Sequence, residues 1–304
     1  MNIPTATWRI ALNLPAMVLA ASLCIAGTAQ AAGTLEKIRN SETIVLANRK
    51  ASLPFSYLDE RGMPIGYTLD ICLKLIEAVK RELKLPRLDV RYLTVSPSDR
   101  IGAIVDGKAD LECGSTTNNA ERRKQVAFTV PHFVYGIRML VRSDAGIRDW
   151  PDLRGKRVVT TRDTTTVGLL AERDKVRALN LTLLEGQDHD DSFSQVQKRA
   201  ADAFAMDDVL LYGLRAGSPN PADFAIVGDA LSVETYAIML RKNDPAFKAV
   251  IDREMTRLIT NGELTVLYDK WFDSPVPPKG LNLKMPMSYL MRDLMRFPGG
   301  ASDD

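Results

Sequence analysis

The sequence predicts an α/β protein with two lobes that face one cleft. Short apolar runs typical of buried strands alternate with stretches whose apolar residues recur at helical spacing, an order that favours helices layered on largely parallel sheets. Strand, hydroxyl-rich loop and helix follow one another around residues 114–120 and again around residues 160–166, which indicates two similar halves. The chain has 304 residues, 45% of them hydrophobic, enough for one large or two medium domains with a sizeable core.

Residues 1–31 have the features of a secretory signal peptide. Arg9 supplies a positive charge, an apolar run over residues 10–25 follows, and Ala29-Gln-Ala31 offers a cleavage site of the small-x-small type. Because no later apolar run is long enough to span a membrane, we expect cleavage after Ala31 and a mature protein outside the cytoplasm.

The first half of the mature chain alternates helix and strand signals. Apolar residues at helical spacing predict an amphipathic helix over residues 71–83, and Ser96-Pro-Ser-Asp99 marks the start of another helix. The expected elements, in order, are a helix over 34–40, a strand over 43–47, the helix over 71–83, a strand over 88–94, a helix over 100–106, and strands over 111–113 and 133–142.

The second half repeats this alternation. Gly155 precedes its first strand, and Asp188-His-Asp-Asp-Ser192 has the composition of a helix cap. The expected strands are 158–161, 181–185, 203–205, 224–227 and 236–240. The expected helices are 167–179, 193–200, one that begins with residues 206–208, 244–261 and 263–272. After Pro275-Val-Pro-Pro278 the tail should pack loosely along one lobe.

The stretch 110–128 combines a strand end, a turn at Gly114, four hydroxyl or amide residues and a helix start capped by Asn119. Backbone N–H groups at a helix start favour anions, and Arg122 or Arg123 adds a planar fork suited to a carboxylate. The alternative is an ordinary strand–turn–helix with a solvated basic face.

Composition limits the classes of function. Lys and Arg number 40 and Asp and Glu 38, and no basic stripe is interleaved with aromatic residues, so we expect no nucleic-acid partner. The sequence offers no Ser/His/Asp order, metal cluster or phosphate loop, so we expect neither a metal nor a cofactor. Cys72 and Cys113 could bridge in an oxidising compartment, but we expect two buried free thiols.

Six motifs carry a family resemblance. They are PFSY at 54–57, ECGSTTNN with the following ER and KQ pairs within 112–128, DHDDSF at 188–193, MDD at 206–208, LRKNDP at 240–245 and KWF at 270–272. From about residue 34 to residue 283 the chain resembles periplasmic solute-binding proteins of polar amino acid ABC importers (solute-binding protein family 3), especially those for glutamate and aspartate. The resemblance implies a two-lobe type II periplasmic binding fold, with the ligand cleft between lobes joined by two crossing strands.

The expected lobe boundaries follow from the position of the crossing strands. The chain should leave the first lobe near residues 136–138 and return near residues 234–237. The expected parts are lobe 1 over 33–137 and 235–280, lobe 2 over 138–234, and a C-terminal tail over 281–304 on lobe 1.

The resemblance also assigns roles to nine residues. Arg122, Ser115 and Thr117 are expected to bind the α-carboxylate of an amino acid. Thr165 and its neighbour Thr164 are expected to be further donors, and Asp207 is expected to accept from the ammonium group. Those expected to surround an acidic side chain are Arg49, Arg100 and His189. Without the resemblance, lone arginines in loops would be expected to be solvated. Asp208, beside Asp207, is expected to be structural.

Two departures from the relatives leave open whether aspartate or glutamate is preferred. Pro97 stands where relatives carry Ser, with Ser96 and Ser98 on either side. Arg162-Asp163 stands where relatives carry Ser-Gly, which adds bulk near the cleft.

The function implied is capture of L-glutamate or L-aspartate in the periplasm and delivery to the membrane permease of an ABC importer, by a monomer that is not an enzyme. The alternatives are a dehydratase-type enzyme on the same fold, a binding protein for another polar amino acid, and a module that serves a signalling receptor.

Overall fold

The computed structural model describes residue 1, residues 33–277 and residues 280–297. The expected signal peptide therefore falls almost entirely outside the described residues, as does the end of the tail. The fold lies in the compact unit that begins at Gly33.

The first sheet is mixed and has the strand order β5-β1-β6-β14-β7. β1 pairs in parallel with β5 and β6, whereas β14 runs antiparallel to β6 and β7. Its strands are β1 (Thr43–Asn48), β5 (Asp89–Thr94), β6 (Leu111–Glu112), β7 (Val126–Phe128) and β14 (Met239–Arg241).

The second sheet has the order β10-β9-β11-β8-β12. β9 pairs in parallel with β10 and β11, whereas β8 runs antiparallel to β11 and β12. Its strands are β8 (Phe133–Arg142), β9 (Arg157–Thr161), β10 (Thr182–Gly186), β11 (Ala203–Asp207) and β12 (Phe224–Val227). Three short strands, which the sequence analysis missed, form a separate small sheet: β2 (Ala51–Ser52), β3 (Ser56–Leu58) and β4 (Pro64–Ile65).

Two strands connect the two large sheets, as expected. The first part of β8 pairs with β13 (Val233–Tyr236), and from Ile137 onward β8 pairs with strands of the second sheet. The prediction of one strand over 236–240 was wrong. Strand β13 ends at Tyr236, which pairs with β8. Strand β14 begins at Met239 and belongs to the first sheet, so the two ends of the expected strand have different partners.

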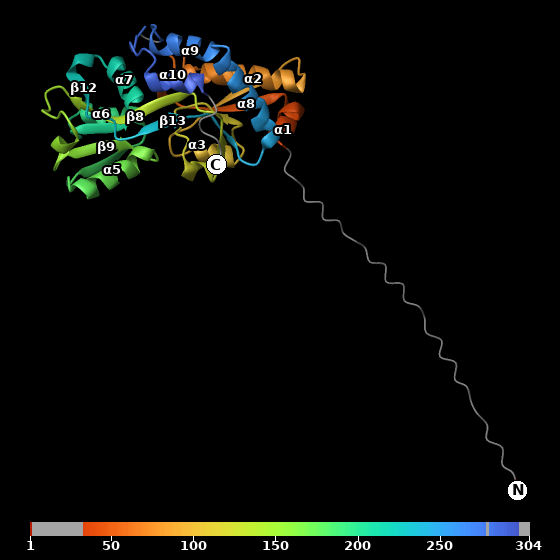
Figure 1. Cartoon of the computed structure of the whole chain (residues 1–304), viewed down its shortest axis with the longest axis horizontal. Coiled ribbons are helices and arrows are strands. Elements are labelled where there is room, and N and C mark those ends of the chain that lie inside the picture. Colours follow the sequence, from red (N-terminus) through yellow and green to blue (C-terminus); the bar gives the residue numbers. More distant parts are fainter. Residues whose placement is uncertain (2–32, 278–279, 298–304) are drawn as a thin grey trace. The chain divides into compact units, whose positions relative to one another are not determined.

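Ten α-helices are described between residues 33 and 297: α1 (Thr34–Ser41), α2 (Tyr67–Leu83), α3 (Arg100–Val105), α4 (Ala120–Arg123), α5 (Thr165–Arg177), α6 (His189–Gln197), α7 (Asp208–Gly217), α8 (Pro245–Thr260), α9 (Glu263–Phe272) and α10 (Tyr289–Arg296). Short 3₁₀ helices cover Trp150–Leu153 and Pro221–Asp223. Figure 1 shows α2 and α3 on opposite sides of the first sheet, and α5 and α7 on opposite sides of the second. This layering confirms the α/β class.

The alternation of side chains along β1 explains how both faces of the first sheet are covered. Ile44 and Leu46 belong to the larger buried core, together with the apolar residues of α2. Ala47 belongs to a smaller core with Ala103 and Ile104 of α3. Full burial of a Leu or Ile side chain contributes roughly 1.5–3 kcal/mol, so the helices are held mainly by these faces.

Helix α2 begins four residues earlier than predicted, because the loop before it caps its first turn. The N–H groups of Tyr67 and Thr68 donate to the carbonyls of Pro54 and Phe55, at 2.8 and 3.0 Å. Gly66, with φ +140°, precedes the helix, and a Cβ there would lie 2.2 Å from the Phe55 carbonyl oxygen. Only glycine fits this position.

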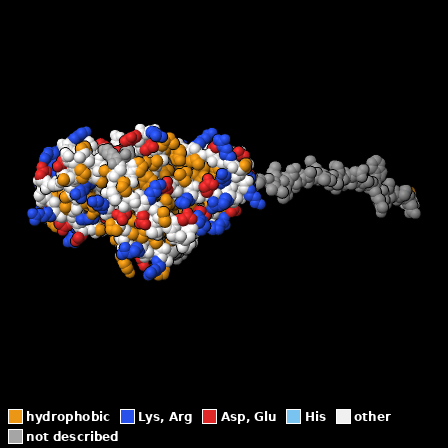
Figure 2. Space-filling view, turned by 90° about the horizontal axis from the view of Figure 1, so that it is seen from above, with side chains coloured by type: hydrophobic (Ala, Val, Ile, Leu, Met, Phe, Trp, Pro, Cys, Tyr) orange, Lys and Arg blue, Asp and Glu red, His pale blue; other side chains and the backbone are white. Residues whose placement is uncertain are grey.

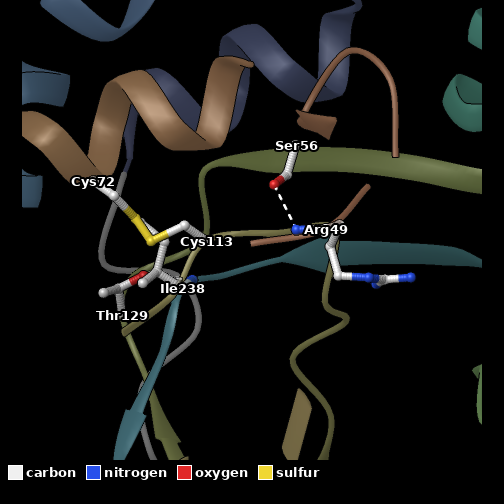
Figure 3. The surroundings of a disulfide bond; sticks show 6 residues. All are labelled: Arg49, Ser56, Cys72, Cys113, Thr129 and Ile238. Atoms are coloured by element: carbon white, nitrogen blue, oxygen red, sulfur yellow. Dashed lines mark hydrogen bonds between the residues drawn. A yellow bond between two sulfur atoms is a disulfide. The ribbon is translucent and has the colours of Figure 1, made fainter. Parts of the chain in front are cut away.

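The expectation of two free thiols was wrong. Cys72 on α2 and Cys113, which follows β6, form a disulfide whose Cα atoms are 6.3 Å apart (Figure 3). Both residues are fully buried in the larger core. Packing of α2 on the sheet brings them within the 4.4–6.8 Å range of Cα distances typical of disulfides, which a sequence separation of 41 residues could not reveal.

The C-terminal region contains a helix that the sequence analysis did not predict. α10 packs against α8 and β8, and its Met291 is 1% exposed. The Met285 N–H donates to the Phe272 carbonyl at 3.0 Å, which ties the segment before α10 to the end of α9. Within the described residues, none of the helices has the length and apolar character needed to cross a membrane.

Candidate functional site

The predicted ligand-binding residues lie at strand ends or in the first turns of helices. Those near the first sheet are Arg49 after β1, Ser115 and Thr117 after β6, Arg100 in α3 and Arg122 in α4. Those near the second sheet are Thr164 and Thr165 after β9, His189 at the start of α6, and Asp207 at the end of β11. Parallel strands place these positions at one edge of each sheet, where α/β proteins bind ligands.

Three arginines are buried at this site, not solvated. Arg49 and Arg100 are each 2% exposed and Arg122 is 7% exposed. The Arg122 Nη1 donates to the Thr117 carbonyl at 3.0 Å. Arg100 Nη2 and Arg122 Nη2 both donate to the carbonyl of Asp163, at 3.2 and 3.3 Å, and so link the two halves of the fold.

Donor groups remain unpaired within this cluster. Arg49 Nη1 and Arg100 Nε have no hydrogen-bond partner in the described part of the chain. The backbone of Arg49 is fixed by its N–H, which donates to Ser56 Oγ at 2.9 Å (Figure 3). Unpaired buried donors cost free energy, so guanidinium groups in this arrangement favour anionic ligands.

Burial and neighbouring positive charges lower the pKa values of Arg49 and Arg100. Burial, together with the positive charges of Arg122 and Arg49, lowers the pKa of Arg100 to about 9. Burial also lowers the pKa of Arg49, and the carboxylate of Glu112 opposes that change. The three guanidinium groups therefore lie close enough to act together on one ligand.

His189 is buried beside two of these arginines. Its Nδ1 lies 2.9 Å from the hydroxyl oxygen of Thr161. Burial, followed by the positive charges of Arg49 and Arg100, holds the pKa of His189 well below its usual value of 6.5. The imidazole is therefore neutral at neutral pH and offers one N–H donor.

Asp207 is the negatively charged residue of the site. It is 3% exposed, the Tyr236 hydroxyl donates to its Oδ2, and its Oδ1 lacks a partner among the residues described. Burial raises the pKa of Asp207 to about 7, while the hydrogen bond from Tyr236 lowers it. Asp208 accepts instead from the N–H groups of Gly136 and Val209, at 3.3 and 2.7 Å, in keeping with its expected structural role.

The hydroxyl residues of the candidate site differ in their hydrogen bonding. Thr117 and Thr165 belong to one chain of hydrogen bonds: Thr117 Oγ1 lies 2.7 Å from the Tyr135 hydroxyl, and Tyr135 and Thr165 both donate to Glu234 Oε2, at 2.8 and 2.9 Å. The Thr164 hydroxyl donates to the Thr161 carbonyl at 2.6 Å within its own loop. Ser115 Oγ is buried without a partner in the described structure.

Several residues of the site were missed by sequence reasoning. Tyr135, Glu234 and Tyr236 lie on the crossing strands β8 and β13 and reach the ligand-binding residues from there. The sequence signal available was their position on the strands predicted to join the lobes. Glu112 lies within a predicted strand, but its electrostatic interaction with the arginines was not anticipated.

The two departures from the relatives meet in the structure. Asp163 has a left-handed backbone (φ +57°), and its carbonyl accepts from two arginines while its carboxylate accepts from the Ser98 hydroxyl. The Ser96 hydroxyl donates to Asp99 at 2.6 Å. Both serines beside Pro97 are therefore engaged in contacts within the protein.

The chain is similar in sequence to known solute-binding proteins. The L-glutamate/L-aspartate-binding protein of Pseudomonas aeruginosa is 46% identical over 293 residues, which cover 95% of this chain and 97% of that protein. The glutamate/aspartate import solute-binding protein of Salmonella typhimurium is 42% identical over 90% of each chain. Such proteins are solute-binding proteins, so the alternative of an enzyme is not supported.

Solved structures share the fold. The solute receptor for L-cysteine of Neisseria gonorrhoeae superposes with a TM-score of 0.70 at 20% identity, covering 79% of this chain and 93% of that chain. The P235GK mutant of ArgBP from T. maritima gives a TM-score of 0.69 at 25% identity, covering 78% of this chain and 98% of that chain. The profile of the bacterial extracellular solute-binding proteins, family 3, matches residues 44–274. The fold, the relatives and this match together show that the chain belongs to family 3 of the bacterial extracellular solute-binding proteins.

Proposed function

We propose that this protein captures L-glutamate and L-aspartate outside the cytoplasm and delivers them to the permease of an ABC importer. The observation that carries this proposal is one buried site with three arginines and the carboxylate of Asp207. Two of the arginines have nitrogen atoms, and Asp207 has an oxygen atom, that lack a partner among the described residues. An acidic amino acid has two carboxylates and one ammonium group, and this site offers partners for all three. The relatives named for glutamate and aspartate support the choice of ligand.

The backbone of the amino acid would be bound by residues from both halves. Arg122 would bind the α-carboxylate bidentately, with Ser115 and Thr117, and with Thr164 and Thr165 at the start of α5, as further donors. Asp207 would accept from the ammonium group. Hydrogen bonds to charged groups contribute roughly 1.5–3 kcal/mol each.

Arg49, Arg100 and His189 would bind the side-chain carboxylate. Their burial next to one another supports this role, since the pKa shifts of Arg100 and His189 report the same positive surroundings. A neutral amide in this place would leave the guanidinium charges without an ionic partner. The site should therefore discriminate against glutamine.

The cellular setting and the lobe boundaries are parts of the same proposal. We infer lobes over 33–137 with 235–280 and over 138–234, a tail over 281–304 on the first lobe, cleavage of residues 1–31 on export, and a periplasmic monomer. The interleaving of Lys, Arg, Asp and Glu side chains on the face in Figure 2 supports a protein without a nucleic-acid partner.

Two substitutions and two ligands test the ligand assignment. Arg100→Met should weaken L-glutamate strongly and L-glutamine little, because glutamine gains nothing from the charge of Arg100. Arg122→Met should weaken both ligands, because both have an α-carboxylate. We expect the wild type to prefer glutamate over glutamine by up to about 10⁴-fold. Isothermal titration calorimetry against all amino acids measures these constants, and equal affinity for glutamine and glutamate would refute the acidic pocket.

A further inference from the structure

Glu112 is a buried carboxylate for which the proposed ligand contacts give no role. It lies in β6 and is fully buried. Neither of its carboxylate oxygens has a hydrogen bond of normal geometry among the described residues, although the nearby Thr116 hydroxyl lowers its pKa. Burial raises the pKa of Glu112 above its usual value, and the positive charges of Arg100, Arg49 and Arg122 oppose this change. Glu112 therefore faces the arginines of the candidate site.

The space around Glu112 is set by Gly114. A Cβ at position 114 would lie 2.2 Å from Glu112 Oε1 and 2.8 Å from Arg49 Cγ. The Glu112 carboxyl group and the aliphatic stem of Arg49 thus pack over the same glycine. The absence of a side chain at Gly114 lets Glu112 reach the arginines.

The charges of the buried cluster can be compared with those of the ligand. Arg49, Arg100, Arg122, Glu112 and Asp207 are each at most 7% exposed, and we call these five residues the buried charge cluster. With His189 neutral and both carboxyl groups ionised, three guanidinium groups and two carboxylates leave one net positive charge. Glutamate and aspartate each have one net negative charge, so ligand and cluster balance. Without the charge of Glu112 the cluster would match a dianion instead.

We propose that Glu112 is a selectivity residue, whose carboxylate reduces the positive potential of the buried charge cluster. As a result, an amino acid with one net negative charge is bound in preference to a dicarboxylate without an ammonium group. This inference rests on the proposed function, because it concerns the choice among ligands at that site. Glu112 acts on the ligand through charge, at a distance, while Asp207 makes the ammonium contact.

The proposal predicts two changes of opposite sign. Glu112 repels each ligand carboxylate and attracts the ammonium group. Removing its charge should favour glutamate over glutamine, because only glutamate has the side-chain carboxylate that was repelled. The same removal should favour glutarate over glutamate, because only glutamate loses an attraction to its ammonium group. A general loosening of the site would weaken all ligands and would not produce this pattern.

The experiment uses Glu112→Gln, Glu112→Met and the matched control Glu254→Gln. Glu254 is another buried glutamate (6% exposed), and its ion pairs are with Arg81 and Arg257, away from the site. Calorimetry at pH 7.5 gives dissociation constants for L-glutamate, L-glutamine and glutarate. In both Glu112 variants the glutamine-to-glutamate ratio of dissociation constants should rise, and the glutarate-to-glutamate ratio should fall. Each change should be about tenfold, the size expected for unit charges about 10 Å apart at an effective dielectric constant near 20.

The outcomes separate this inference from the proposed function. Wild-type ratios in Glu112→Gln, with glutamate still bound by the wild type, overturn the role of Glu112 alone. The same shifts in Glu254→Gln also overturn it, since they would then reflect the loss of any buried charge. A wild type that binds no acidic amino acid overturns both proposals. Glu112→Met removes the charge without introducing an amide, so it provides the test should Glu112→Gln not fold by circular dichroism.

Discussion

Asp207 illustrates how burial sets the chemistry of a single residue in this protein. In water an aspartate is fully ionised at neutral pH, but burial raises the pKa of Asp207 to about 7. The charges of Glu234 and Asp208 contribute to this increase, whereas Tyr236 and Arg122 oppose it. An ammonium group bound at Asp207 would stabilise the ionised form, so binding and deprotonation should be coupled.

Affinity for glutamate should therefore depend on pH. Above about pH 7.5 Asp207 is mostly ionised in the free protein, and the dissociation constant should change little until Arg100, whose pKa is about 9, begins to lose its proton. Below pH 7 the free protein holds a proton that binding must release, so the dissociation constant should rise by up to about tenfold per pH unit. His189 should contribute little, because burial and the positive charges of Arg49 and Arg100 hold its pKa well below its usual value of 6.5. Calorimetry between pH 5.5 and 8.5 measures the profile.

Asp207→Asn and Asp208→Asn provide the matched controls for this coupling. At pH 8 Asp207→Asn should cost about 2–5 kcal/mol of binding free energy, the range for breaking a buried charge pair, and its profile should lose the rise below pH 7. Asp208→Asn should bind nearly as the wild type does. Equal losses from the two substitutions would contradict the assignment of Asp207, and a pH dependence that persists in Asp207→Asn would assign the proton to another group such as Glu112.

At the scale of elements, a covalent link joins α2 to the segment that follows β6. The disulfide of Cys72 and Cys113 joins the helix to the chain just before Gly114, where the hydroxyl residues of the candidate site begin. The side chain of Arg49 extends away from this disulfide in Figure 3. The disulfide therefore supports the backbone near the site and lies apart from the Arg49 guanidinium group. We therefore expect its loss to affect stability more than ligand choice.

Replacing both cysteines by alanine should lower stability. Opening a link between residues 41 apart releases chain entropy worth about 4 kcal/mol at 25 °C, and a chain of this size should lose on the order of 10 °C in its melting temperature. Thermal unfolding followed by circular dichroism, with and without a reductant present during unfolding, measures the change. The double variant should be insensitive to the reductant, and a melting temperature equal to that of the oxidised wild type would argue against a stabilising bridge.

At the scale of the whole molecule, the proposed ligand contacts are divided between two sheets that β8 and β13 connect. Arg100 and Arg122 reach the Asp163 carbonyl from the side of the first sheet, and Thr165 reaches Glu234 from the other. A ligand held by both halves favours the arrangement in which they approach each other. Binding should thus shift the population of conformations toward a closed state.

Small-angle X-ray scattering tests this expectation. The radius of gyration should decrease when saturating L-glutamate is added to the mature protein, and Arg122→Met, which removes the α-carboxylate contact, should show no decrease at the same concentration. A wild-type radius that stays constant across the titration would count against closure of the two halves.

Local patterns were sufficient for the elements that depend on local physics. The apolar run of β1 and the helical spacing of α2 and α8 appear in the sequence, because hydrophobic periodicity and caps act over a few residues. Element ends were less well predicted. The start of α2 depends on carbonyls of the loop 54–55, and the break between β13 and β14 depends on pairing with different sheets.

The candidate site also has features that the sequence predicts and features that only the packed fold decides. The sequence by itself determined which residue types stand at the strand ends, Arg49, Arg122 and Asp207 among them, because their motifs lie in continuous stretches. Only the tertiary structure decided that Cys72 meets Cys113, and that Glu112 faces the arginines. The reason is physical: burial, pKa and the pairing of charges depend on distances between segments far apart in the chain, and those distances exist only after the sheets and helices have packed.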